Sequence, residues 1–258
     1  MNGAFYVGAV GLEAQQRALD TIANNISNVN TPAFKRSEVR FAEIIADRAD
    51  PSVPSASLRS VDTGTAGVMA DAMFMINQPG RIEATGNGAD IAIEGQGFIE
   101  VMGPGGQTLL WRGGTTRVGE DGLLATAEGF GLKAGITVPG DAAGIEIGSD
   151  GVVSALAGPG GSEKVEIGQI MLVKVNDAQA LQRLDGGLYR VDDATTLLAA
   201  QPGEDGMGML VQGAMERSNV ELTSEMVQLM MVQRAYAANA QIVQAADQLM
   251  AIANGLRK

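Results

Sequence analysis

Residues 222–256 read LTSEMVQLMMVQRAYAANAQIVQAADQLMAIANGL. In this stretch an apolar or aromatic side chain recurs every seven residues, at Leu222, Leu229, Tyr236, Val243 and Met250. A second row lies beside the first, at Ala235, Ile242, Leu249 and Leu256. Two adjacent rows of this kind predict a long helix that is buried against more than one neighbour. Upstream, Ser218 and Glu221 have the spacing of a capping box, which predicts the start of the helix.

The N-terminal end carries a matching pattern. Phe5, Leu12, Leu19 and Ile26 recur every seven residues, and Ile22 and Val29 follow the last two by three. This spacing predicts a helix over about residues 3–29 with an apolar row that packs on other helices. Pro32 has no amide hydrogen and restricts the residue before it, so the helix should end at Asn30-Thr31-Pro32.

The middle of the chain indicates β structure. Short apolar runs at 90–94, 98–101 and 167–175 are separated by the glycine-containing sequences GPGG (103–106 and 158–161), GEDG (119–122) and GSDG (148–151). Strands of four to eight residues between such turns are typical of a small antiparallel domain. GEDG and GSDG lack the alternating carboxylates and terminal glutamate of a calcium loop, so they are interpreted as tight turns.

These patterns predict an α+β fold in which N- and C-terminal helices pair into a coiled-coil-like helical domain, with a Gly-rich antiparallel β domain inserted between them. The helical domain combines residues 1–44 with residues 213–258. Residues 45–80, which contain three prolines, should form an extended connector, and residues 81–212 a β-rich outer domain. Leu19 and Leu229 should then belong to the same domain.

Composition excludes several classes of function. The chain has 258 residues and neither histidine nor cysteine, so it has no imidazole base, no thiolate nucleophile and no His- or Cys-ligated metal. The net charge of −12 disfavours nucleic acid and anionic membranes as partners. Almost all of that charge lies in residues 51–210, with 20 acidic against 9 basic side chains, while both ends are close to neutral. We therefore expect no cofactor, no metal and no membrane insertion.

Two functions of other classes stay open at this level. A glycan hydrolase could work with paired carboxylates, for which Glu94, Glu100, Glu120 and Asp121 are available. Nothing in their spacing places two of them across a cleft. A monomeric binding module could use the acidic β domain as its binding surface. The apolar, neutral helices at both ends argue instead for burial between chains, because chain ends are usually the least ordered parts of a domain.

Three segments together resemble the bacterial flagellar rod and hook proteins. They are IANNISNVNTPAFKR at 22–36, DIAIEGQGF at 90–98, and a C-terminal set made of QGA at 212–214, ERSNV at 216–220 and QRAY at 233–236. The matches occur in the family's order and span nearly the whole chain. Ala33 stands where the family usually has glycine before Phe34. The QRAY ending and the chain length most resemble the subunits of the distal part of the rod, with the proximal part as the alternative.

The resemblance implies a non-catalytic structural subunit of the flagellar basal body. Subunits of this family stack helically into a hollow drive shaft, with the terminal helices inside and the β domain outside. The partners implied are further copies of the chain, neighbouring rod proteins and the hook protein, with the surrounding ring proteins and the rod-capping protein as additional candidates. The location implied is the periplasm-spanning rod. The opening residues MNGAFYVGAVGL lack a basic region, so we expect export without a cleaved signal peptide.

On this reading the apolar rows and the first helix's asparagines form the subunit interface. Buried amides fix the register between packed helices, whereas asparagine also simply terminates helices. The predicted interface residues are Leu12, Leu19, Ile22, Asn24, Asn25, Ile26, Asn28, Leu222, Leu229, Tyr236, Val243 and Met250. Lys35, Arg36 and Arg40 form a small basic group that could meet carboxylates of neighbouring subunits. We expect both ends to be largely disordered in the free chain and helical only after assembly.

Overall fold

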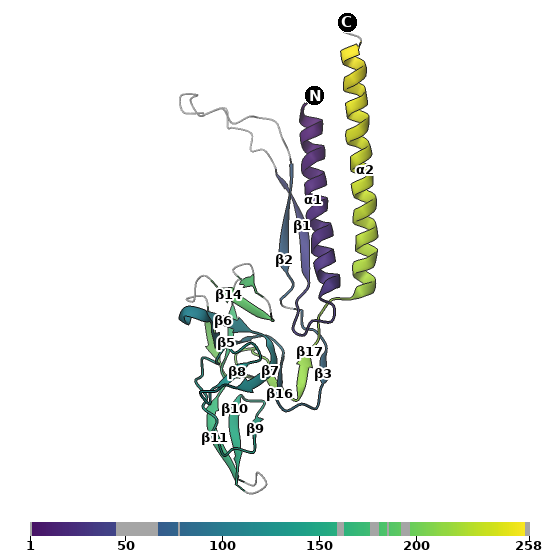
Figure 1. Cartoon of the computed structure of the whole chain (residues 1–258). Helices are drawn as coiled ribbons and strands as arrows, with labels where there is room; N and C mark the ends of the chain where they lie inside the picture. Colours follow the sequence, from purple (N-terminus) through teal and green to yellow (C-terminus); the bar gives the residue numbers. More distant parts are fainter. Residues whose placement is uncertain are drawn as a thin grey trace, which may run out of the picture. The chain divides into compact units, whose positions relative to one another are not determined.

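A computed structural model describes residues 2–44, 67–76, 78–158, 163–175, 181–184, 186–191 and 197–255. The fold is α+β, with two long helices and strands arranged in several sheets (Figure 1). The chain divides into two compact units. The helical unit consists of residues 1–27, 37–73 and 221–258, and the β unit consists of residues 28–36 and 74–220.

The helical unit contains α1 (Asn2–Ser27), α2 (Leu222–Gly255) and the hairpin strands β1 (Ser37–Ile44) and β2 (Gly67–Phe74). The two helices lie side by side and run in opposite directions (Figure 1). A Cβ atom added to Gly8 would lie 2.8 Å from Val243 Cγ2, so this glycine permits a close approach of α1 to α2. At the other end of α1, Asn25 contacts Glu225. Among the described residues, neither helix is long and apolar enough to cross a membrane.

Both predicted helices are present, with different ends. The first ends at Ser27, and Asn28–Asn30 form a turn in which the Asn28 carbonyl accepts a 3.1 Å bond from the Thr31 amide. The predicted capping box is wrong, because the Ser218 hydroxyl accepts a 3.3 Å bond from the Val220 amide and α2 begins at Leu222. The Glu221 carbonyl accepts the 3.0 Å bond from the Glu225 amide.

The β unit is antiparallel throughout its described pairings. Its elements are β3 (Ile82–Ala84), β4 (Asp90–Glu94), β5 (Phe98–Met102), the short 3₁₀ helix η1 (Pro104–Gly106), β6 (Thr108–Trp111), β7 (Gly113–Val118), β8 (Leu124–Thr126), β9 (Gly144–Ile147), β10 (Val152–Ala157), β11 (Glu163–Gln169), β12 (Leu172–Val175), β13 (Leu181–Arg183), β14 (Leu188–Val191), β15 (Leu197–Ala200), β16 (Met209–Gln212) and β17 (Ala214–Glu216). The sheets have the orders β13-β14-β6-β5-β12-β15, β16-β4-β7-β8, β11-β10-β9 and β17-β3.

The core of the β unit draws on several of these sheets. Ile91 and Ile93 of β4 pack in one buried cluster with Ile99 of β5 and Trp111 of β6. The neighbouring positions Ala92, Phe98 and Leu110 on the same strands are buried too, so these strands are covered on both faces. A second cluster includes Phe98 and Tyr189, whose ring centroids are 5.4 Å apart with the planes at 66°.

The two predicted tight turns are confirmed and share one geometry. In GEDG the Gly119 amide donates to the Leu123 carbonyl at 2.8 Å, and in GSDG the Gly148 amide donates to the Val152 carbonyl at 2.8 Å. The last glycine of each sequence has a positive φ, 76° at Gly122 and 86° at Gly151. A side chain would strain both positions, which explains the glycines.

The structure differs from the prediction for the run 167–175, and it describes only part of the predicted connector at 45–80. The run 167–175 is not one strand, because the chain leaves β11 at Gln169 and enters β12 at Leu172 in a different sheet. The predicted extended connector at 45–80 contains the strand β2, which pairs with β1. Residues 45–66 and residue 77 of that connector lie outside the described residues.

Candidate subunit interface

The predicted interface residues of α1 differ in burial. Ile22 and Asn25 are buried, and Asn24 is exposed on the helix surface. The half-buried residues are Leu12, Leu19, Ile26 and, just beyond the helix end, Asn28. Leu19 and Leu229 both lie in the helical unit. A seven-residue row that is only partly covered within one chain leaves apolar surface for further packing.

The predicted residues of α2 are less covered. Leu229 and Val243 are half-buried, while Leu222 and Tyr236 keep 41% and 38% of their surface exposed. Met250 lies in α2, and its side chain is outside the described residues. The helix therefore presents much of its predicted contact row to its surroundings.

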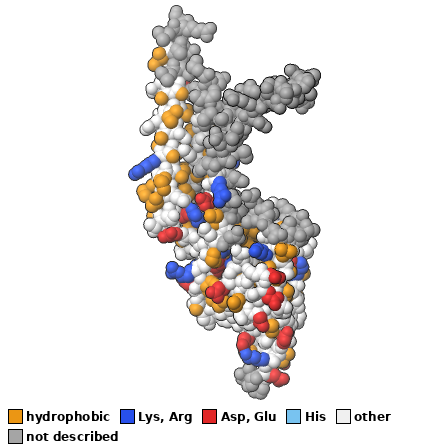
Figure 2. Space-filling model, turned by 180° about the vertical axis from the view of Figure 1, so that it is seen from behind, with side chains coloured by type: hydrophobic (Ala, Val, Ile, Leu, Met, Phe, Trp, Pro, Cys, Tyr) orange, Lys and Arg blue, Asp and Glu red, His pale blue; other side chains and the backbone are white. Residues whose placement is uncertain are grey.

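A second group of exposed apolar side chains lies on α2, and of its members sequence reasoning placed only Ile242 in a predicted apolar row. Each member exposes between 44% and 64% of its surface; the group consists of Met226, Val227, Met230, Met231, Ile242 and Ile252. Figure 2 shows hydrophobic side chains gathered along the helical unit. Methionine and aromatic side chains are enriched in the cores of protein interfaces. Exposed apolar side chains gathered on one element are typical of protein interaction sites.

A groove between α1 and α2 adjoins this surface. Its volume is about 450 Å³, and it is lined by Gly11, Ala14, Gln15, Met231, Val232, Ala235 and Asn239. The Oε1 atom of Gln15 is buried and has no hydrogen-bond partner among the described residues. The groove thus combines mostly small and apolar walls with one buried polar acceptor.

Asn25 is the asparagine that the fold uses as a register lock. Its amide nitrogen donates to the Ser37 carbonyl at 2.8 Å and to Glu225 Oε2 at 3.1 Å. Its oxygen accepts a bond of 3.0 Å from the Ser37 amide. All three residues are buried. One side chain therefore fixes α1 against both β1 and α2 within the helical unit, because a shift of any of them would leave buried polar atoms unpaired.

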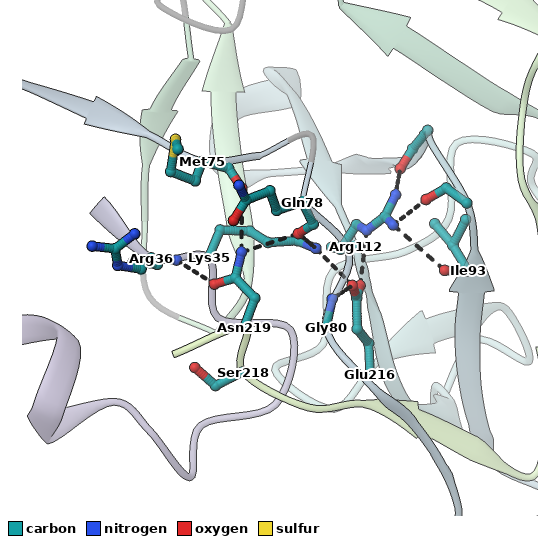
Figure 3. A network of polar contacts seen from close by, with 12 residues as sticks. Lys35, Arg36, Met75, Gln78, Gly80, Ile93, Arg112, Glu216, Ser218 and Asn219 are labelled. Atoms are coloured by element: carbon teal, nitrogen blue, oxygen red, sulfur yellow. Dashed lines mark hydrogen bonds and ion pairs between the residues drawn. The ribbon is translucent and has the colours of Figure 1, made fainter. Parts of the chain in front are cut away.

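A buried ion cluster lies in the β unit, built on the carboxylate of Glu216 (Figure 3). Lys35 Nζ donates to Glu216 Oε1 at 2.6 Å, and Arg112 Nε donates to Oε2 at 2.9 Å. The Gly80 amide also donates to Oε1, at 2.7 Å. A Cβ atom on Gly80 would lie 1.8 Å from the Arg217 carbonyl oxygen, so only glycine fits here. Each charged side chain is at least 97% buried.

The cluster holds two cations and one carboxylate. The remaining donors of Arg112 reach the carbonyl oxygens of Ile93, Gly95 and Gly97, which connect the cluster to strand β4 and the loop after it. Burial lowers the pKa of Lys35, and Arg112 lowers it further, whereas Glu216 opposes both. The prediction that Lys35 meets a neighbouring subunit is wrong, because its ammonium group is used inside its own chain.

The segment that contains Lys35 is held by Asn219 as well. The Arg36 amide donates to Asn219 Oδ1 at 2.6 Å, and Asn219 Nδ2 donates to the carbonyls of Met75 and Gln78 at 3.3 and 3.0 Å (Figure 3). The turn before it places Ala33 at φ 55°, the left-handed region in which glycine is the usual residue. Ala33 therefore adopts the backbone conformation that glycine, the family's usual residue at this position, would favour.

No sequence signal marked Glu216, Arg112 and Asn219 as a polar site. Lys35 and Glu216 are separated by 181 positions, and neither belongs to a local ligand motif. Among the described residues there is no group of three or more acidic side chains that could hold a metal ion.

Three families of known proteins match successive parts of the chain. Residues 5–35 match the family described as flagella basal body rod protein. Residues 92–155 match the flagellar hook protein FlgE/F/G D1 domain, and residues 211–256 match the flagellar basal body rod FlgEFG protein C-terminal region.

Three of the similar whole proteins are FlgG rod proteins. The flagellar basal-body rod protein FlgG of Caulobacter vibrioides is 34% identical over 98% of this chain and 99% of its own length. The FlgG protein of Borreliella burgdorferi is 32% identical over the full length of both chains. That of Bacillus subtilis is 32% identical over 96% of each.

Proposed function

Because this chain belongs to the flagellar basal-body rod protein family, we propose that it polymerises helically through α1 and α2 into the hollow shaft that transmits torque to the hook. It is a structural subunit of the rod in the flagellar basal body. The similarity to FlgG proteins along the whole chain assigns it to the distal rod and does not favour the proximal one.

The exposed apolar side chains of α2 are the observation that carries this proposal. A helix that leaves Met230, Met231 and Ile242 more than half exposed is unfavourable for an isolated chain in water. Full burial of such a side chain is favourable by roughly 1.5–3 kcal/mol relative to full exposure, so burial of the exposed half of each adds about 1 kcal/mol. The α2 helices of other copies can bury these side chains. Residues 211–258 carry four acidic and four basic side chains, so the C-terminal segments of two copies have no net charge and do not repel each other.

In the assembled rod, the terminal helices would form a coiled-coil-like inner layer. Residues 1–44 and 213–258 would supply that layer, residues 45–80 the connector and residues 81–212 the outer β-rich domain. The predicted residues of both helices, with Leu19, Leu229 and Tyr236 among them, would contact neighbouring copies. The acidic β domain would face solvent, since 20 of the chain's 30 acidic side chains lie in residues 51–210.

Other rod and hook components are partners of a subunit of this family. We further propose that copies of the chain itself are its most numerous contacts, and that the surrounding ring proteins and the rod-capping protein meet it during assembly. Flagellar export would deliver the subunit to the growing tip.

Sedimentation combined with electron microscopy tests polymerisation. The purified chain at rising concentration should form tubes or large helical assemblies. A chain that stays monomeric at every concentration would contradict the proposal and favour a monomeric module that binds through its acidic β surface.

We also propose that the two ends become ordered only on assembly. Both α1 and α2 would then gain their packing partners from other copies, so the entropy cost of ordering is offset there. Amide exchange should show protection of residues 222–250 in the polymer and little in dilute monomer. Equal protection of the ends and the β unit in the monomer would contradict this.

A further inference from the structure

Three segments of the β unit continue along the chain directly into the helical unit. They are residues 28–36, which follow Ser27 and lead to Ser37, residues 74–80, which follow residue 73, and residues 216–220, which lead to Glu221. Any force that acts on the helical unit therefore reaches the β unit through four covalent connections, two of which are at the ends of residues 28–36. The contacts between the three segments determine how that force is distributed among them.

Every pair of these segments is joined by side-chain hydrogen bonds. Lys35 Nζ and Asn219 Nδ2 both donate to the same acceptor, the Gln78 carbonyl, each at 3.0 Å (Figure 3). Asn219 Oδ1 accepts from the Arg36 amide at 2.6 Å. Glu216 accepts from Lys35 at 2.6 Å and from the Gly80 amide at 2.7 Å. The three segments thus form a closed triangle of contacts.

Backbone bonds support the same triangle. The Ala33 amide donates to the Glu216 carbonyl at 2.8 Å, and the Met75 amide donates to the Arg36 carbonyl at 2.8 Å. Arg112 then connects Glu216 to the Ile93 carbonyl on β4. A force on one segment is therefore distributed over the other two and into a central sheet.

We propose that Lys35 and Asn219 are the positioning residues of a load-bearing clamp, which keeps the three segments in register under torque. That the chain carries torque rests on the proposed function. The contacts that form the clamp do not depend on it. A buried triad of charges adds little to equilibrium stability, because desolvation offsets much of the attraction. Charge-assisted hydrogen bonds that must break together do, however, raise the barrier to displacement of the segments.

Single-molecule pulling on the full chain, held by its two ends, tests the clamp. The variants are Lys35→Met, Asn219→Ala and the double variant. Lys35→Met keeps a side chain of similar length and leaves Glu216 paired with Arg112, so it should fold. Lys133→Met is the matched control, because Lys133 makes a 2.7 Å ion pair with Glu100 in the same unit, with half of its own side chain exposed.

Under a fixed load the β unit of each clamp variant should unfold about tenfold faster or more, since each lost factor of ten needs only a small reduction of the barrier. The acceleration should exceed the one that the loss of stability, measured from the thermal midpoint, accounts for. Lys133→Met should change neither the unfolding rate nor the thermal midpoint. Unchanged unfolding under load would overturn the clamp, and so would a faster rate fully accounted for by a lower thermal midpoint. If Lys35→Met does not fold, the clamp is tested on Asn219→Ala, with the unfolding rate under load and the thermal midpoint measured in the same way.

Motility provides the second readout. In a strain that lacks its own rod subunit, the clamp variants should support swimming in buffer and lose it, or shed filaments, in a viscous medium. Equal performance with Lys133→Met at high viscosity would overturn the clamp. Failure of the wild-type chain itself to build a rod would instead refute the proposed function, and the pulling experiment would still decide the clamp.

Discussion

Asn25 and Glu225 are 200 positions apart in the sequence, and their side chains share a 3.1 Å hydrogen bond in the interior of the helical unit. Asn25 also exchanges two bonds with the backbone of Ser37. A single amide thus determines how the end of α1, the start of β1 and the first turn of α2 fit together. Predictions about register can be tested at this residue.

Asn25→Ala should destabilise the helical unit by about 1–3 kcal/mol, because it leaves the buried Ser37 amide and carbonyl unpaired. Thermal dissociation of assembled rods measures the loss. Asn24→Ala is the matched control, since Asn24 is the neighbouring residue and its side chain is exposed. An equal effect of the two substitutions would show that Asn25 has no special role in register.

Ala33 should accept glycine but not a larger branched residue. Its φ of 55° strains any side chain, and the residue is 3% exposed. Ala33→Gly relieves the strain and loses a buried methyl group, so the net change should stay within about 1 kcal/mol. Ala33→Val should cost more than about 2 kcal/mol, since branched residues disfavour this conformation further. Chemical denaturation of the two variants gives the comparison, and equal stability would contradict the strained turn.

Tyr189→Phe should stabilise the β unit. The Tyr189 hydroxyl is buried without a hydrogen-bond partner among the described residues, which costs about 1–3 kcal/mol. Burial also raises the pKa of Tyr189 from 10.0 to about 12. The unfolded chain therefore loses this proton first, and the wild type should lose stability as the pH rises from 10 to 12. Denaturation at several pH values should show a gap between variant and wild type that widens above pH 10; a constant gap would contradict the buried hydroxyl.

Leu229→Asp should block rod assembly and leave the β unit folded. A carboxylate at the half-buried Leu229 would be buried without a cation at a helix interface, at a cost on the order of several kcal/mol. Leu198→Asp is the control, because Leu198 is 56% exposed in the β unit. Circular dichroism should show an intact β signal in both, while fractionation and motility should fail only for Leu229→Asp. Normal motility of that variant would refute the interface, as would a lost β signal.

The sequence alone predicts the elements with strong periodicity. Rows such as Leu229 and Val243 follow from a helix with one apolar face, and the turns at Gly122 and Gly151 follow from backbone conformations that exclude side chains. Family resemblance adds the order of the parts. These features depend on local sequence, so they can be derived from it.

The polar contacts depend instead on tertiary pairing. A lysine next to an arginine, as at Lys35 and Arg36, is usually a solvated surface group, and only the fold reveals that Lys35 is buried against Glu216. Ser218 has capping-box spacing, yet its hydroxyl serves a local turn. Strand β2 was missed because its sequence GVMADAMF includes glycine, aspartate and two alanines, which are depleted in strands.

If α1 and α2 are the polymer contacts of a rod subunit, electron cryo-microscopy of rods built from the full chain will show them at the contacts between copies. The map should place both helices of every copy around the channel, with Met230, Met231 and Tyr236 buried against helices of neighbouring copies. A map in which these side chains face solvent, or in which copies contact one another only through the β unit, would contradict this role of the two helices.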